Sequence, residues 1–359
     1  MRAAADRYRS LDHWRGIAAL WVVFFHAGVG WADLPPAGLA GWLPRLSSVG
    51  WFGFHLFFVI SGYCIGVRAA QDFAQSRGGG SFLFDRAWRI LPVYWAALLL
   101  AIVAALVAQP FNHVPLASAP GQPGVLPGSL AHLGIDLALL GPWFGYQPYL
   151  LVSWTLTSEL VFYLLIAAGL AFAKWMTSAW PALALLVGLA FVIAARPALL
   201  STTPLAFWPE FVCGLLTWLS GRMRATRPAI ACLCWAMITG LGVLGTLGNE
   251  YSTTLPWAAA FALLLAMLRP FDGRIAEFSA FRWLGFCGIV SYSLYLIHMP
   301  IISPLRNLII RYWPPTSPGF AVVPIALTAI ATGAGWLFYR VVELAVEQRR
   351  KARRRTTLA

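Results

Sequence analysis

Two ionisable residues lie in the first hydrophobic run of the chain, which reads LDHWRGIAALWVVFFHAGVG from Leu11 to Gly30. Arg15 stands near the start of this run and His26 near its end. On a helix this spacing corresponds to a rise of about 16 Å and nearly whole turns, so both side chains would share one face. Ionisable groups inside a bilayer are costly and indicate a functional site. An imidazole at that depth could serve as a general base.

Further polar side chains recur at a similar depth in other hydrophobic runs. They are, in chain order, His55, Ser61, Glu159, Ser291, Tyr295 and His298. The last three are spaced four and three residues apart, which places them on one helix face. A carboxylate such as Glu159 beside a histidine can orient the ring or raise its pKa. Taken singly, each residue is explained by a hydrogen bond between helices, but together they favour a polar cavity that opens outward.

Two arginines three residues apart, Arg86 and Arg89, stand at the start of the third hydrophobic run, in RAWRILPVYW. They would share one helical face near the cytoplasmic surface. Paired guanidinium groups suit the bidentate binding of phosphates on a nucleotide-like donor. Arginines that flank the cytoplasmic end of a span also need no ligand, and the spacing leaves both interpretations open. Snorkelling at the membrane surface likewise explains Arg15 taken alone.

The composition places these residues in a membrane protein. Hydrophobic residues make up 60% of the 359 residues and charged residues 11%, which excludes an ordinary soluble domain. The net charge of +13 is expected from cytoplasmic loops and does not indicate nucleic-acid binding. The five cysteines lie in hydrophobic stretches, so we expect neither a disulfide framework nor a metal site. Because His26 interrupts the apolar core of the first run, we expect a retained span rather than a signal peptide.

Eleven hydrophobic runs could form helices. They cover residues 13–30, 48–69, 83–108, 130–141, 150–173, 179–196, 205–220, 229–247, 253–268, 283–304 and 320–342. The run at 130–141 is too short to cross a bilayer, so we expect a re-entrant or buried segment there. Without it, the Arg-rich loops all fall on the cytoplasmic side. We therefore predict an all-α polytopic membrane protein with about ten transmembrane helices and both termini cytoplasmic. A single membrane domain would cover 1–345, followed by a basic cytoplasmic tail at 346–359.

Six blocks follow one another along the chain. They read RSLDHWRGIAALWVVFFH, GWFGFHLFFVISGYCI, RAWRILPVYW, SWTLTSELVFYLL, SYSLYLIHMPI and YRVVELAVEQ, and they include Ser153, Trp154 and Glu343 besides the residues named above. In type and order these blocks resemble the motifs of the acyltransferase-3 family of bacterial integral-membrane acyltransferases. His55 stands where many relatives carry an acid. Because the chain ends soon after Glu343, we expect no fused esterase-like domain of the kind found in some members.

The resemblance implies transfer of an acyl group, commonly acetyl, from cytoplasmic acyl-CoA to a carbohydrate hydroxyl. The acceptor would be an exopolysaccharide, an O-antigen or another envelope glycan or its lipid-linked precursor. The location would be the bacterial cytoplasmic (inner) membrane, and no metal is required. Arg86 and Arg89, together with Arg15, would hold the CoA phosphates. His26, oriented by Glu159, would act as general base or carry the acyl group itself.

The remaining polar residues would bind the substrate or stabilise the oxyanion that forms when the thioester is attacked. They are His55, Ser61, Ser291, Tyr295 and His298. The alternative function is a proton-coupled secondary transporter or flippase of a glycan or lipid-linked intermediate, with the buried histidines and glutamate as a proton relay. Paired internal repeats typical of many transporters are absent from the sequence. A relay also has no use for the pair of Arg86 and Arg89, which a CoA-dependent enzyme would need.

Overall fold

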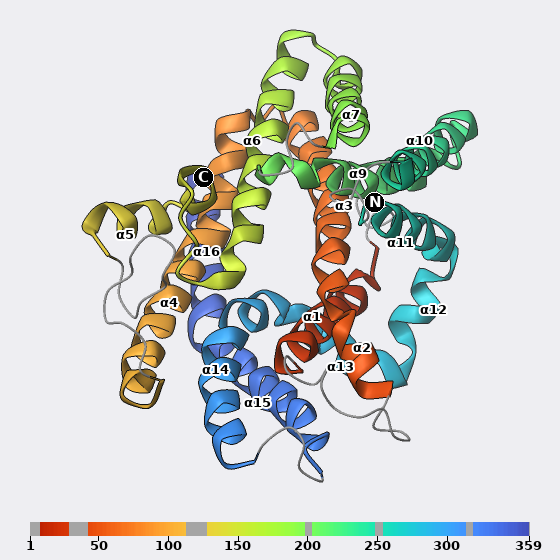
Figure 1. The fold of residues 1–359 in the computed structure, drawn as a ribbon. Helices are drawn as coiled ribbons and strands as arrows, with labels where there is room; N and C mark the ends of the chain where they lie inside the picture. Colours follow the sequence, from red (N-terminus) through yellow and green to blue (C-terminus); the bar gives the residue numbers. More distant parts are fainter. Residues whose placement is uncertain are drawn as a thin grey trace. The chain divides into compact units, whose positions relative to one another are not determined.

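The computed structural model describes residues 8–28, 42–112, 128–197, 203–247, 254–313 and 319–358. All regular elements in these ranges are helices, and no strand occurs among them, which confirms the all-α prediction (Figure 1). The chain divides into two compact units built from alternating segments. Unit 1 comprises Met1–Arg15, Phe54–Arg86 and Thr157–Gly285. Unit 2 comprises Gly16–Gly53, Ala87–Leu156 and Phe286–Ala359.

The α-helices follow the hydrophobic runs of the sequence. Their bounds are α1 Leu11–Ala27, α2 Trp42–Ser48, α3 Gly53–Ala74, α4 Gly79–Asn112, α5 Leu130–Leu137, α6 Trp154–Trp175, α7 Ala179–Ala195, α9 Trp208–Met223, α10 Pro228–Leu247, α11 Leu255–Leu268, α12 Asp272–Glu277, α13 Arg282–Ile289, α14 Ser291–Tyr312, α15 Val322–Phe338 and α16 Leu344–Leu358. Short 3-10 turns connect several of them: η4 Gly50–Phe52, η5 Gly141–Phe144, η6 Leu151–Ser153, η7 Pro204–Phe207, η9 Arg269–Phe271 and η10 Ser279–Phe281. One turn of π-helix, η11 Tyr339–Glu343, joins α15 to α16.

Seven helical stretches in the described ranges are long and apolar enough to cross a membrane. They are Arg45–Ala74, Gly79–Gln109, Leu151–Trp175, Pro228–Leu247, Leu255–Glu277, Ser291–Tyr312 and Val322–Arg353. Three further predicted spans form shorter helices: α1 and α7 have 17 residues each, and α9 has 16. The seven long apolar stretches indicate a multi-pass membrane protein.

The run at 130–141 forms only the eight-residue helix α5. Ser129 caps its start by accepting a hydrogen bond from the backbone N–H of His132, and the chain turns after Leu137. Eight residues rise about 12 Å, far less than the hydrocarbon thickness. The prediction that this segment does not cross the membrane by itself is consistent with that length.

Helix α9 forms the core of unit 1, because every residue from Trp208 to Ser220 is buried. It contacts α3 backbone to backbone at two glycines. A Cβ atom at Gly62 would lie 1.9 Å from the carbonyl oxygen of Phe211, and one at Gly214 would lie 1.8 Å from that of Val59. Small residues allow such close approach, which stabilises helix pairs where lipid removes the hydrophobic driving force.

Substitution of Gly214 tests this contact. Gly214→Ala places a methyl group against the α3 backbone and should lower the free energy of unfolding by about 3 kcal/mol, the upper range for an overpacked core. Gly221→Ala on the same helix is the control, because a Cβ there meets nothing within 4 Å. The thermal melting of both variants in detergent measures the effect. Equal melting temperatures for the two variants would contradict the packing described.

In unit 2, helix α14 packs on α15 through another close contact. A Cβ atom at Gly335 would lie 2.9 Å from Cα of Leu294. The hydroxyl of Ser293 donates to Oε2 of Glu343, in the π-helical turn, at 2.5 Å. Helix α14 also contains Pro300 and Pro304, which lack the N–H group that would continue the helical hydrogen bonds.

Candidate active site

Unit 2 brings together two histidines that lie far apart in the sequence. The ring centroids of His26, on α1, and His298, on α14, are 5.1 Å apart, and their planes are inclined by 40°. His298 is completely buried, whereas His26 is half-buried. No other pair of histidine rings in the described part of unit 2 is in contact.

A backbone hydrogen bond fixes the tautomer of His298. Its Nδ1 lies 2.7 Å from the carbonyl oxygen of Tyr295. Because a carbonyl oxygen only accepts, Nδ1 must carry the hydrogen, and in the neutral ring Nε2 holds the lone pair. Nε2 has no hydrogen-bond partner in the described ranges of the chain. Unit 2 therefore contains a buried imidazole with an available basic nitrogen beside a second imidazole.

The other two predicted residues of α14 lie in the interior of unit 2. The hydroxyl oxygen of Tyr295 lies 3.0 Å from Oγ1 of Thr155 and 3.4 Å from the carbonyl oxygen of Val152. Ser291 is completely buried, and its Oγ has no hydrogen-bond partner among the residues described here. Tyr295 is thus held by its neighbours, while Ser291 retains an uncommitted hydroxyl.

Arg306, which the sequence analysis missed, fixes the backbone at His26. Its Nη1 donates to the carbonyl oxygen of His26 at 3.1 Å. This carbonyl belongs to the last turn of α1, so Arg306 contacts the C-terminal end of that helix. Within the described residues Arg306 has no carboxylate partner, which leaves its positive charge near the two imidazoles unneutralised. The sequence did offer a signal for Arg306, because this charged residue lies two positions after Pro304 in a candidate membrane helix.

Unit 1 brings Glu159 and Ser61 together, two of the residues named from the sequence. Oε1 of Glu159, on α6, accepts hydrogen bonds from Ser61 Oγ at 3.2 Å and from Tyr163 Oη at 2.5 Å. Oε2 accepts no hydrogen bond from any described residue. The carboxylate is therefore oriented through one oxygen, and the other can accept a further hydrogen bond.

Arg86 lies against Tyr163, the residue that donates to this carboxylate. It is buried, and its guanidinium carbon lies 5.5 Å from the ring centroid of Phe82 and 5.8 Å from that of Tyr163. Arg89 follows one turn later on α4 and is exposed. Arg15, on α1, lies 3.8 Å from the carboxylate of Asp12.

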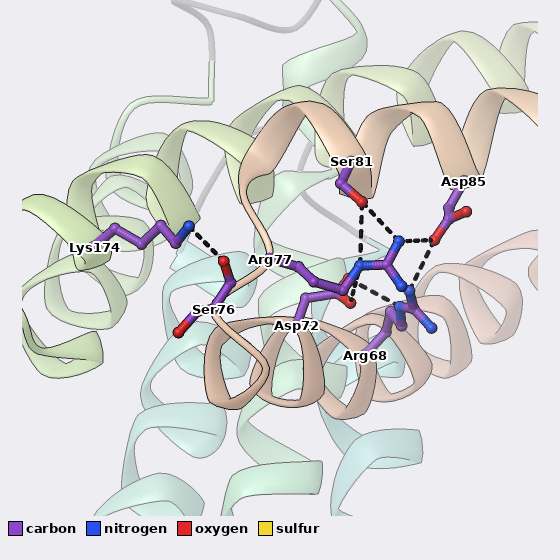
Figure 2. Close-up of polar contacts among 7 residues, drawn as sticks. All are labelled: Arg68, Asp72, Ser76, Arg77, Ser81, Asp85 and Lys174. Carbon is purple, nitrogen blue, oxygen red and sulfur yellow. Dashed lines mark hydrogen bonds and ion pairs between the residues drawn. The ribbon is translucent and has the colours of Figure 1, made fainter. Parts of the chain in front are cut away.

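A network of ion pairs holds the turn between α3 and α4, just before the two arginines (Figure 2). Oδ2 of Asp85 accepts from Nη2 of Arg68 at 2.8 Å and from Nη2 of Arg77 at 3.0 Å. Arg68 also donates to Asp72, which is completely buried. Nζ of Lys174, at the end of α6, donates to the carbonyl oxygen of Ser76 at 2.6 Å. The network fixes where α4 begins and hence the position of Arg86, one residue after Asp85.

The substitution Asp85→Asn tests the network. It removes the charge that two arginines share and should cost about 2 to 3 kcal/mol of unfolding free energy, as expected for hydrogen bonds to a charged group. Glu277→Gln is the control, because Glu277 and Arg9 form an exposed ion pair of the kind that contributes little. Thermal melting of both variants provides the measurement. A melting temperature of Asp85→Asn equal to that of Glu277→Gln would show that the network contributes no stability.

His55 pairs with a second residue that the sequence analysis missed. Its Nδ1 lies 2.6 Å from Oε2 of Glu210, and both side chains are buried. Oε1 of Glu210 accepts from Oγ1 of Thr254 at 2.9 Å. Glu210 stands in the first turn of α9, where the helix dipole favours a negative charge. Glu159 was singled out because it is an acid in an apolar run, and Glu210 could have been singled out for the same reason.

Glu159 belongs to unit 1 and His26 to unit 2. The proposed orientation of His26 by Glu159 is therefore untested, as are the roles assigned to Arg15, Arg86 and Arg89. The described residues contain no group of three or more His, Cys, Asp and Glu side chains placed to hold a metal ion.

Comparison with known proteins decides the family. A family model described as an acyltransferase domain, that of the acyltransferase-3 family, matches residues 8–340. The chain belongs to the acyltransferase-3 family. The six sequence blocks all overlap this range, so the resemblance noted from the motifs is confirmed.

Two curated proteins are similar to the chain over most of its length. The exopolysaccharide production protein ExoZ of Rhizobium meliloti (strain 1021) is 29% identical over 322 residues, which cover 86% of this chain and 93% of ExoZ. BcsY of Komagataeibacter xylinus, named as a candidate membrane-bound transacylase, is 27% identical over 318 residues, covering 82% of this chain and 73% of BcsY. No solved structure matches the chain significantly.

Proposed function

We propose that this protein is an O-acyltransferase of the bacterial cytoplasmic membrane. It transfers an acyl group, commonly acetyl, from acyl-CoA to a hydroxyl of an exopolysaccharide or related envelope glycan, or of its lipid-linked precursor. The match to the acyltransferase-3 family across residues 8–340 is the observation that carries the proposal. Similarity to ExoZ, whose name assigns it to exopolysaccharide production, supports the carbohydrate acceptor.

The proposed topology has ten membrane spans with both termini in the cytoplasm. It places the turn after α3 and the end of α6 on the cytoplasmic side. The hydrogen bond from Lys174 to Ser76 supports this arrangement, because it joins those two segments at one end of unit 1. The basic residues of this end, including Arg68 and Arg77, follow the positive-inside rule.

The donor would bind through its phosphates near the cytoplasmic surface. Arg86 and Arg89, together with Arg15, would provide guanidinium groups for bidentate contacts with the phosphates of CoA. The ion-pair network of Asp85 fixes the segment of α4 that presents Arg86. A preorganised arginine loses less side-chain freedom when it binds an anion, which favours affinity.

The reaction needs a base, because an unactivated hydroxyl is a weak nucleophile for a thioester. In the proposed mechanism His26 removes the hydroxyl proton while the oxygen attacks the carbonyl carbon. The tetrahedral intermediate then collapses, the carbon–sulfur bond breaks, and the CoA thiolate recovers the proton from the imidazolium. The positive charge of Arg306, held at the carbonyl of His26, would stabilise the oxyanion that forms during the attack.

The proposal is tested in membranes that contain the wild type, His26→Ala or the double variant Arg86→Ala/Arg89→Ala at equal protein levels. Labelled acetyl-CoA is supplied, and label is followed into glycan or glycolipid of the native host. We expect labelling by the wild type and its loss in both variants. Arg222→Ala/Arg224→Ala, a second arginine pair at the C-terminal end of α9, is the control and should label like the wild type. Absence of labelling by the wild type with acetyl-CoA and with longer acyl-CoA donors would refute the acyltransferase proposal.

His298 gives a sharper test of the proton chemistry. In His298→Asn the amide nitrogen can still donate to the carbonyl of Tyr295, but the basic Nε2 is lost. Because the ring of His298 lies beside that of His26, the proposed base, we expect loss of Nε2 to impair proton transfer at His26 and to lower turnover about 100-fold, with an unchanged melting temperature. Wild-type turnover in this variant would exclude His298 from proton transfer.

A further inference from the structure

Tyr163 makes two contacts that belong to two different parts of the proposed site. It lies on α6 in unit 1 and is 4% exposed. Its hydroxyl donates to Oε1 of Glu159, one helical turn earlier, at 2.5 Å. The face of its ring lies 5.8 Å from the guanidinium carbon of Arg86. One side chain thus contacts both the carboxylate and the arginine to which the proposed function assigns roles.

The ring restrains Arg86 without using its hydrogen-bond donors. The five N–H groups of a guanidinium lie in its plane, whereas an aromatic ring contacts its face. The buried Arg86 lies against the rings of Tyr163 and Phe82. These contacts limit the rotamers of the arginine, and a ring contact with the guanidinium face does not itself occupy an N–H group.

The hydroxyl restrains Glu159 in a similar way. A hydrogen bond from a hydroxyl to a carboxylate is charge-assisted and short, as the distance of 2.5 Å indicates. Ser61 donates to the same oxygen, at 3.2 Å. Both donors therefore act on Oε1, and the direction of Oε2 is fixed as a consequence.

We propose that Tyr163 is a positioning residue that couples the acyl-donor site at Arg86 to the carboxylate of Glu159. This inference rests on the proposed function, since both partners take their roles from it. The ring of Tyr163 sets the donor affinity through Arg86, and its hydroxyl sets the rate of the chemical step through Glu159. The two parts of the side chain therefore have separable effects.

The chain offers a closely matched control in Tyr8. This tyrosine also belongs to unit 1 and is also 4% exposed. Its hydroxyl donates to the carbonyl oxygen of Leu265 at 2.9 Å, and the guanidinium carbon of Arg269 lies 4.8 Å from its ring centroid. Tyr8 thus has the burial, hydrogen bond and arginine contact of Tyr163, but neither Glu159 nor Arg86 as a partner.

The experiment compares Tyr163→Phe, Tyr163→Leu, Tyr8→Phe and Tyr8→Leu in the purified full-length protein and in membranes. Acetyl-CoA binding is measured by calorimetry, and kcat and KM are measured by transfer of labelled acetyl. Tyr163→Phe should keep Kd for acetyl-CoA and lower kcat about tenfold, the effect of losing an orienting hydrogen bond. Tyr163→Leu should lower kcat similarly and also raise Kd about tenfold through loss of the arginine contact. The Tyr8 variants should change only the melting temperature.

The kinetic and binding results decide whether Tyr163 positions Arg86 and Glu159. Wild-type kcat and Kd in both Tyr163 variants would overturn the inference. Equal losses in the variants of Tyr163 and Tyr8, in proportion to their melting temperatures, would also overturn it, since they would reduce Tyr163 to core packing. A wild-type protein that binds neither acetyl-CoA nor a longer acyl-CoA would refute the proposed function, and this inference with it. Loss of kcat alone in Tyr163→Phe, together with loss of kcat and a raised Kd in Tyr163→Leu, is the result that supports the coupling role. An unchanged Kd in Tyr163→Leu would overturn it.

Discussion

The absence of water from the bilayer interior is the constraint on which the rest of this structure depends. Backbone groups in hydrocarbon must bond within their own segment, so the membrane-crossing segments are helices. Ionisable side chains must find partners inside the protein. Glu159 accepts from Tyr163 and Ser61, and Glu210 accepts from Thr254 and lies against His55. In each case the partner of the carboxylate is a hydroxyl or an imidazole. Such a partner can give its proton to the carboxylate, whereas an arginine stays protonated.

Each unit holds a distinct set of chemical groups. Unit 2 contains the imidazole pair of His26 and His298 beside the cation of Arg306, and the hydrogen bond from His298 to Tyr295 determines which ring nitrogen carries the lone pair. Unit 1 contains a carboxylate with one uncommitted oxygen and an arginine restrained by aromatic rings. The first set suits proton transfer and stabilisation of an oxyanion. The second suits the recognition of phosphates and the orientation of a polar partner.

Hydrophobic patterning was sufficient to predict the helical architecture and the short segment at 130–141, because the bilayer imposes length and polarity on each span. The candidate site could be predicted only in part. Spacing places Ser291, Tyr295 and His298 on one face of a helix, but it does not determine which other helix that face meets. The contacts of Arg306 with His26 and of Glu210 with His55 depend on helix rotation and packing. Each residue was visible in its own run, but the histidine that it contacts could not be predicted from that run alone.

The glycine contact between α3 and α9 has a consequence for motion. Backbones that touch at Gly62 and Gly214 cannot slide or rotate past each other without a steric clash, because close-packed interiors do not deform continuously. A rearrangement of unit 1 that preserves this contact therefore has to move α3 and α9 together, with the distance between His55 and Glu210 unchanged.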